Sequence, residues 1–284
     1  MIQERVFSIY PAISLPIVTQ DEDRGFFKCC ERLLVLANGS SNTWENDVNS
    51  AWIKLSDPTD TVTFTLLNSS GLATTYTPTT NEFINEENAF YTTIPWADVL
   101  ASDGEDCYRI KVEYNIGGLS GDFIWAVYDL RTFSIQNALG TARIRTLFNL
   151  NQKIEGINFT GSNVEDSIRF NGQIEIGQPN MEIDSLIYEN RRVETVVNEN
   201  LQSYDLLTDP YTDAIIKQLT NLYLLSANEM FISDHNAHSS SYQIFDLPVT
   251  IQESPEVSKP DKFSRFRILS ATLSDREKNK RTFY

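Results

Sequence analysis

The sequence predicts a mainly β protein: an N-terminal antiparallel β-sandwich of the immunoglobulin-like kind, then a C-terminal β-sheet or small barrel with one flanking helix. Two observations favour strands. Short runs of β-branched and aromatic residues are separated by turn clusters, and several of these runs alternate between apolar and polar residues. Only one segment has helical periodicity. At 284 residues, 41% of them hydrophobic, the chain can bury the cores of two domains.

The first half reads as short strands joined by turns. The clearest is 61–67, in which Val62, Phe64 and Leu66 share one face, and 72–77 is expected to return beside it as a hairpin partner. The other strands expected in this half are 27–37, 51–55, 107–114 and 123–128.

The second half combines further strands with one helix. The helix is expected over 211–226, where Asp209 can cap it, Pro210 suits the first turn, and apolar residues recur at helical spacing. The expected strands are 167–176, 181–188, 192–207, 229–233, 242–251 and 263–273.

A polar junction near 150–165 divides the chain. We expect an N-terminal arm at 1–24, a sandwich domain at 25–150 and a barrel-like domain at 151–284 that ends in a basic segment.

Charge separates the last residues from the rest. The chain has 23 basic and 39 acidic residues, a net charge of −16. Residues 259–284 hold eight basic and three acidic side chains, about +5, so the remainder carries about −21. An acidic body repels phosphates and acidic membranes, and we expect no specific nucleic-acid binding and no membrane association. The basic end is either a solvated terminus or a surface that docks on the next copy.

The cysteines indicate a reducing compartment. Cys29 and Cys30 are adjacent and cannot bond without strain, so with Cys107 they make no disulfide framework. We see no signal-peptide pattern and expect synthesis in a cytoplasm. A thiol nucleophile at Cys107 is disfavoured as well, because Glu105 and Asp106 directly precede it and their negative charge raises the pKa of its thiol.

The two histidines lie three residues apart. Asp234, His235 and His238 offer zinc-type ligands, but a Ser- and Asn-rich loop lacks the fixed geometry of such sites. We therefore expect a solvated hairpin loop there, with no metal and no cofactor.

Carboxylate clusters give no clear site. Asp103, Glu105 and Asp106, with Asp57 and Asp60 elsewhere, could hold calcium but lack the spacing of a calcium loop. A pair of carboxylates in a polysaccharide hydrolase stays open, since 39 acidic residues guarantee some close pairs and nothing selects one. Without a phosphate-binding loop or nucleophile motif, we expect a non-enzymatic role.

All four tryptophans lie in the first half. Trp44, Trp52, Trp96 and Trp125 could form an aromatic platform for sugars, which keeps a carbohydrate-binding adhesin or fibre module as an alternative function. Packing in the core is the favoured interpretation, because Trp125 lies in an apolar strand and Trp96 follows Ile94-Pro95.

Several stretches of the second half resemble virion proteins of tailed phages that infect Bacteroidota, including the crAss-like phages. The resemblance covers about residues 155–284, and the first half resembles only generic β-sandwich domains. The stretches are INFTG at 157–161 with IRFNG at 168–172, PNMEIDSLIYENRRVETV at 179–196, DPYTDAIIKQLTNLYLLSANEMFISDHN at 209–236 and FSRFRILSATLSDREKNKR at 263–281.

The resemblance implies a structural protein of the virion tail or neck, made in the bacterial cytoplasm and assembled into twelve-fold rings stacked below the portal. Its partners would be further copies of itself and the adjacent tail or portal rings, with DNA passing through during ejection. No catalytic residues come with it. From the charge pattern we add one hypothesis, that an acidic neighbour is contacted by the basic residues Arg265, Arg267, Lys278, Lys280 and Arg281.

Overall fold

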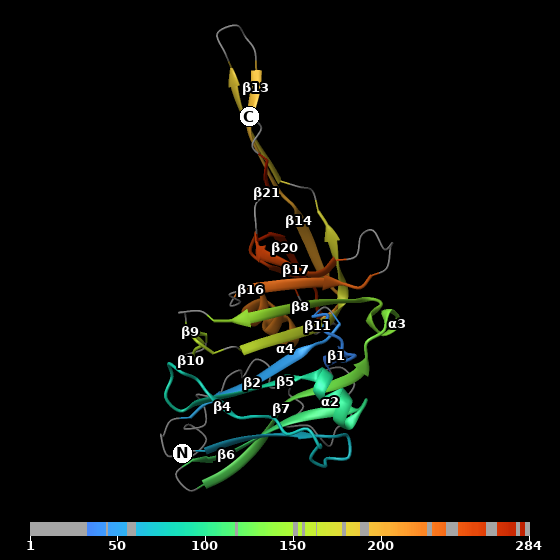
Figure 1. Ribbon diagram of the computed structural model, residues 1–284, viewed down its shortest axis with the longest axis vertical. Coiled ribbons are helices and arrows are strands. Elements are labelled where there is room, and N and C mark those ends of the chain that lie inside the picture. The colour runs from blue at the N-terminus through green and yellow to red at the C-terminus, as the bar shows by residue number, and fades with distance from the viewer. Residues whose placement is uncertain are drawn as a thin grey trace.

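The structure, a computed structural model, describes residues 33–43, 45–55, 61–116, 119–149, 153–154, 157–162, 164–177, 180–187, 193–225, 229–236, 244–259, 266–276 and 279–281. The protein is mainly β, as the sequence predicts. Figure 1 shows a body of stacked sheets with a narrow arm of strands that projects from one end. The predicted N-terminal arm, 1–24, lies outside the described residues.

The sandwich consists of two sheets. The first has the strand order β1 (Leu33–Ala37), β7 (Leu119–Thr132), β6 (Cys107–Ile116), β3 (Thr61–Leu67). The second has the order β2 (Val48–Lys54), β5 (Ala89–Pro95), β4 (Asn81–Glu82), and helix α2 (Trp96–Asp103) follows β5 directly.

Two details of the sandwich differ from prediction. β1 pairs with β7 in parallel, so the first sheet is not purely antiparallel. The expected hairpin between 61–67 and 72–77 is wrong: β3 pairs along its whole length with β6, and only a single bridge joins Leu67 to Ala73. The chain does turn back at Asn68, whose side chain accepts hydrogen bonds from the N–H groups of Ser70 and Leu72. The pairing then stops, because the N–H groups of Thr75 and Tyr76 donate to Asp103 instead.

The second half forms a closed barrel. Its six strands follow one another in the order β14 (Ser203–Thr208), β11 (Val164–Ile176), β8 (Thr141–Phe148), β16 (Glu229–Asp234), β17 (Ile244–Ile251), β20 (Leu269–Asp275), and β14 pairs with β20 to close the ring. The short β18 (Glu256–Val257) adds to β20. Small elements complete this half: α3 (Ile135–Ala138), β9 (Lys153–Ile154) with β10 (Ile157–Asn158), and β15 (Tyr211–Thr212) with β19 (Phe266–Arg267).

The strand pairing places the change from sandwich to barrel earlier in the chain than the predicted boundary at residue 150. β8 lies inside the predicted sandwich range of 25–150, but it pairs with β11 and β16 of the barrel. The change of sheet therefore comes between Thr132 and Thr141, before the polar junction that the sequence suggested.

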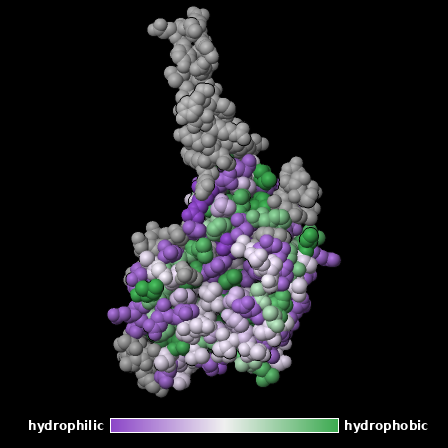
Figure 2. Space-filling view, viewed as in Figure 1, coloured by the Kyte–Doolittle hydropathy of each residue, from purple (hydrophilic) through white to green (hydrophobic). Residues whose placement is uncertain are grey.

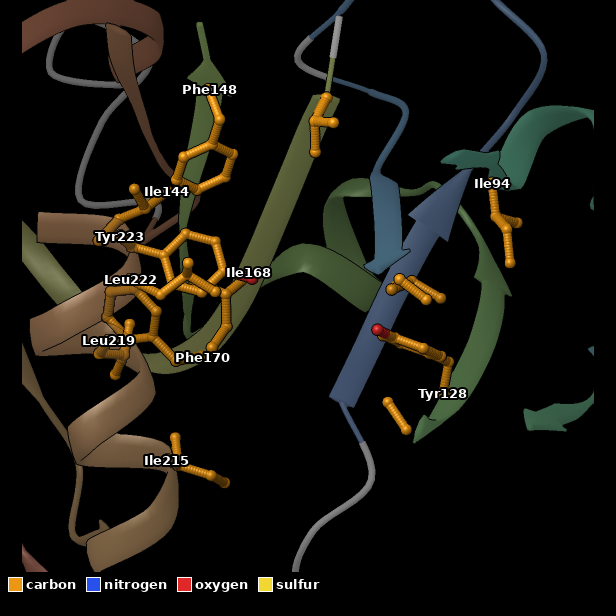
Figure 3. Close-up of a cluster of buried hydrophobic side chains, with 14 of the residues drawn as sticks. Ile94, Tyr128, Ile144, Phe148, Ile168, Phe170, Ile215, Leu219, Leu222 and Tyr223 are labelled. Carbon is orange, nitrogen blue, oxygen red and sulfur yellow. The ribbon is translucent and has the colours of Figure 1, made fainter. Parts of the chain in front are cut away.

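The expected helix is present. It runs as α4 (Asp213–Lys217) and continues as the π-helix η4 (Gln218–Leu224). It begins later than predicted, with Thr212 at the N-cap. Figure 3 shows Ile215, Leu219 and Leu222 of this helix turned toward Ile168 and Phe170 of β11. In the described part of the chain, no helix is long and apolar enough to cross a membrane.

The projecting arm is a separate three-stranded sheet, with the order β12 (Asn180–Ile187), β13 (Val193–Leu201), β21 (Asn279–Arg281). The expected extended run 192–207 is in fact two strands: β13 belongs to the arm and β14 to the barrel. The strand expected at 181–188 is present as β12, and it pairs with β13. The chain thus leaves the barrel after β11, forms the arm, and returns at β14.

Candidate functional site at the sandwich–barrel junction

Six charged side chains meet between the sandwich and the barrel, and we call them the junction cluster. Alternation along two barrel strands positions its arginines. On β11 the odd-numbered Arg169 points toward the sandwich, whereas the even-numbered Ile168 and Phe170 point toward the helix (Figure 3). On β8, Arg143 lies directly across from Arg169. The cluster consists of Asp47, Arg143, Arg145, Glu165, Arg169 and Asp246.

Asp47 is the buried centre of the cluster. It comes from the sandwich, just before β2, and is 1% exposed. Its Oδ1 accepts from Nη1 of Arg143 at 3.1 Å, and Arg169 binds both carboxylate oxygens, with Nε 3.0 Å from Oδ2 and Nη2 3.1 Å from Oδ1. The Leu36 N–H also donates to Oδ2, at 2.8 Å. Burial alone would raise the pKa of Asp47, but the charges of Arg169 and Arg143 outweigh burial and hold the pKa below its ordinary value.

Asp246 provides the outer half of the cluster. Its Oδ1 and Oδ2 accept from Nε and Nη2 of Arg145 at 2.8 and 2.7 Å, the two-point geometry that suits guanidinium and carboxylate. Oδ2 also accepts from the hydroxyl of Thr43 in the sandwich. Asp246 has a φ of +48°, in the left-handed region, where Asp is tolerated better than most residues. The Arg145 guanidinium lies 4.1 Å above the ring of Phe231 and also binds Glu165.

A second buried carboxylate, Asp166, lies beside the cluster. Its Oδ1 accepts from the Asn49 side-chain amide at 2.7 Å and from the Ser50 N–H at 3.2 Å, both on β2. Its Oδ2 accepts from the hydroxyl of Tyr223 on the helix at 3.0 Å. Burial raises the pKa of Asp166 to about 7, despite these hydrogen bonds to the charged form. One carboxylate therefore links the sandwich, the barrel and the helix.

His235 is buried, which corrects the expectation of a solvated loop. It is 5% exposed, between the rings of Phe133 and Phe245, with ring centroids 5.8 Å away on each side. Burial, followed by the charges of Arg169 and Arg143, lowers its pKa to about 3, so the ring is neutral. The turn after β16 carries it inward, because its N–H donates to the Thr141 carbonyl.

The histidines do not form a metal site within the described residues. The Asp234 carboxylate accepts from the Ile174 N–H and from the Asn236 amide. His238 lies outside the described residues. Over the described residues, no group of three or more His, Cys, Asp or Glu side chains is placed to hold an ion.

The carboxylates of the acidic turn that was considered for calcium accept hydrogen bonds from neighbouring segments of the sandwich. Asp103 accepts from the N–H groups of Thr75 and Tyr76, and Asp106 accepts from both the N–H and the hydroxyl of Ser69. Glu105 accepts from the Thr132 N–H at 2.8 Å. These hydrogen bonds hold the pKa values of Asp103 and Asp106 below the ordinary range, although burial acts in the opposite direction. Asp57 and Asp60 lie outside the described residues.

The tryptophans that the structure describes are core residues, as favoured from the sequence. Trp52, Trp96 and Trp125 are each at most 2% exposed. Trp52 packs edge-on against Trp125 with centroids 5.3 Å apart, and the Trp96 Nε1–H donates to Oδ1 of Asn49. Trp44 lies outside the described residues. Nothing in this arrangement makes a platform of exposed rings from the three described side chains.

The five basic residues suggested as an interface are only partly described. Arg267 makes an ion pair with Asp213 at the start of α4, at 3.0 Å. Lys280 and Arg281 belong to β21, whose backbone pairs with β13 in the arm. Arg265 and Lys278 lie outside the described residues. Part of the basic end therefore lies in the arm, beside the end of β13 that leads back to the barrel.

The junction cluster balances its charges internally, since it contains three arginines and three carboxylates. The hydrogen bonds that Asp47 and Thr43 make with this cluster run between the sandwich and the barrel, so they fix one on the other. Sequence reasoning missed it. The available signal was Arg143 and Arg145 alternating within an otherwise apolar strand, a pattern in which both charges must find buried partners.

The comparisons with known proteins give no family: no protein-family profile matches the chain, and no curated protein matches it significantly. The fold and the junction cluster define it as a mainly β protein whose sandwich and barrel are joined by buried ion pairs.

Proposed function

We propose that this protein is a structural subunit of a bacteriophage tail or neck. Copies assemble into a ring stacked below the portal, and the ring helps to build the conduit through which DNA is ejected. The role is non-enzymatic and lies in the virion tail. The resemblance of residues 155–284 to virion proteins motivates the proposal, and one structural observation carries it: the three-stranded arm that projects from the body (Figure 1).

The arm is better suited to contacts between copies than to stabilising a single copy. Its strands share no sheet with the barrel, which closes without them. A projecting sheet with open edges offers backbone hydrogen bonds to another chain. Subunits joined by unlike surfaces form rings when the rotation between them closes.

The body supplies the rigidity that a ring subunit needs. Asp47 and Thr43 of the sandwich are bound to arginines and to Asp246 of the barrel, so the two halves resist hinge motion. On the face shown in Figure 2, apolar residues are scattered among polar ones rather than gathered in one large patch. This surface favours contacts through strand edges and charges over a broad hydrophobic interface.

The overall charge supports the conduit role. A net charge of −16 keeps phosphates from adhering to the walls, so that DNA can slide past. The rival role of a carbohydrate-binding module is weakened, because the described tryptophans are buried and are not available to stack on sugars.

The arm provides the first test. Residues 180–201 are replaced by a short Gly-Ser linker, and the full-length chain and the variant are compared by light scattering and negative-stain imaging. We expect rings from the unaltered chain and monomers from the variant, and the body should still unfold in a cooperative thermal transition because the barrel closes without the arm. Ile135→Ser serves as the control, since Ile135 is an exposed residue on α3. Persistent rings without the arm, or a full-length chain absent from virions, would contradict the proposal.

The basic end provides a second test. Arg265, Arg267, Lys278, Lys280 and Arg281 are replaced together by Gln, and ring dissociation is followed as salt is raised. If they contact an acidic neighbour, the variant should assemble at least tenfold more weakly, about 1.4 kcal/mol, and lose much of its salt dependence. Arg131→Gln is the control, because Arg131 pairs with Asp129 and Glu105 in its own sandwich. Normal rings from the variant with all five substitutions would rule out this contact.

A further inference from the structure

Among the described residues, the strand β3 pairs with another strand along one edge only. It pairs with β6 on one side through all seven residues. On the other side, Thr74 donates its N–H to the Leu66 carbonyl, which covers only the end of the strand. The N–H and C=O of one residue point to the same side of a strand, and successive residues alternate. The backbone N–H and C=O groups of Val62 and Phe64 therefore point to the same side as those of Leu66, away from β6. No described residue forms a hydrogen bond with these groups of Val62 and Phe64.

This edge lacks the features that usually protect an exposed strand. Its sequence, TVTFTLL, contains no charged residue and no proline. Proteins protect free edges with lysine, proline or a bulge, since an open edge recruits other chains. At the opposite edge of the same sheet, Leu36 of β1 is satisfied by Asp47: the Leu36 carbonyl accepts from the Asp47 N–H, and the Leu36 N–H donates to the Asp47 carboxylate. The barrel has closed on itself. No described strand covers the β3 edge, which is therefore a candidate surface for a further strand.

A hollow beside the edge leaves room for an incoming strand. Its volume is about 600 Å³, and it lies between the first two residues of β3 and residues 80–90, which include parts of β4 and β5. Side chains of an added strand that turn toward the core can enter there. The hollow is lined by Thr61, Val62, Thr80, Glu82, Glu87, Asn88 and Phe90.

The arm carries an edge of matching length. β12 has eight residues and pairs only with β13 among the described strands, so its other side is open. In Figure 1 the arm projects from one end of the molecule, and β6, the neighbour of β3, lies at the other end. Two different open edges at opposite ends are what a head-to-tail contact between copies requires.

We propose that β12 of one copy adds to β3 of the next copy as a further strand of the sandwich sheet. The occupant of the β3 edge is thus a second copy of this chain. The inference rests on the proposed ring function and names the surface that receives the arm. The incoming strand satisfies the N–H and C=O groups of Val62 and Phe64 and covers the hollow.

Disulfide cross-linking between two populations of the full chain tests the pairing. Cys29, Cys30 and Cys107 are first replaced by Ser. One population then carries Thr63→Cys, at an exposed position of β3, and a second carries a single Cys at each position from 181 to 186 in turn. The two are co-expressed with different mass tags, and the assembled rings are oxidised. We expect cross-linked heterodimers whose yield alternates with every second position, because alternate side chains of a strand share a face. Ile135→Cys on α3 replaces Thr63→Cys as the control and should give none.

A second variant does not depend on cross-linking geometry. Thr63→Lys places a charge at the edge and should reduce ring yield at least tenfold while the far-UV spectrum stays unchanged. Rings that form without cross-links at any of the six positions overturn the β12–β3 contact and leave the ring function standing. A chain that stays monomeric overturns both.

Discussion

Replacing Asp47 with Asn should lower the free energy of unfolding by about 3 to 5 kcal/mol, the usual cost of removing one partner of a buried ion pair. The substitution keeps the shape of the side chain but removes the charge that faces Arg143 and Arg169, both of which are buried. Two guanidinium groups then remain in the interior without their main counter-charge. Urea or thermal unfolding of the full-length chain measures the loss.

Asp122→Asn is the matched control. Asp122 is 57% exposed and pairs with Lys111 on the sandwich surface, so its loss should change stability by less than about 1 kcal/mol. If Asp47→Asn is no more harmful than this control, the junction cluster does not hold the two halves together.

Asp166→Asn should change how stability depends on pH. The pKa of Asp166 is about 7 in the folded protein, against an ordinary value of 3.8. Between these pH values folding takes up a proton, so this group stabilises the fold most below pH 4 and loses that contribution as pH rises to 7. Asn at this position does not titrate. The stability of the unaltered protein relative to the variant should therefore fall by up to about 1.4 kcal/mol per pH unit between pH 5 and 7, then level off.

Unfolding free energies at pH 5, 6, 7 and 8 measure this slope. Asp209→Asn, at an exposed position, controls for the exchange of a carboxylate for an amide. A flat difference for Asp166→Asn across the same range would show that the carboxylate is ionised throughout and that its hydrogen bonds outweigh burial.

Local patterns predicted local structure well. The strand at 61–67 has the predicted bounds, because alternation over Val62, Phe64 and Leu66 depends only on neighbours in sequence. The helix was found from the spacing of its apolar residues, although its start moved to Asp213 and its second part became a π-helix. The hairpin expected at 72–77 stops after one bridge, because the Asp103 carboxylate from α2 binds the N–H groups of Thr75 and Tyr76.

The candidate site depends on contacts that no local pattern reveals. Arg143 lies about a hundred residues from its partners Thr43, Asp47 and Asp246. A charge within an apolar strand shows that a partner must exist, but the partner is chosen by which strands meet. The same holds for Asp166, which binds Asn49 and Tyr223 from two distant segments. His235 was misjudged for a related reason, since its loop is polar in sequence and yet its ring turns inward.

The buried ion pairs decide how this protein can be dissected in the laboratory. A fragment that ends before Thr141 would contain Asp47 but neither of its arginine partners. A fragment that begins at Thr141 would contain Arg143 and Arg169 but not Asp47. Each half would also expose apolar residues of the core that both halves share, so neither should be well folded when produced alone. Mapping of binding surfaces by truncation would then report misfolding rather than lost contacts, so single substitutions in the intact chain are the appropriate tool.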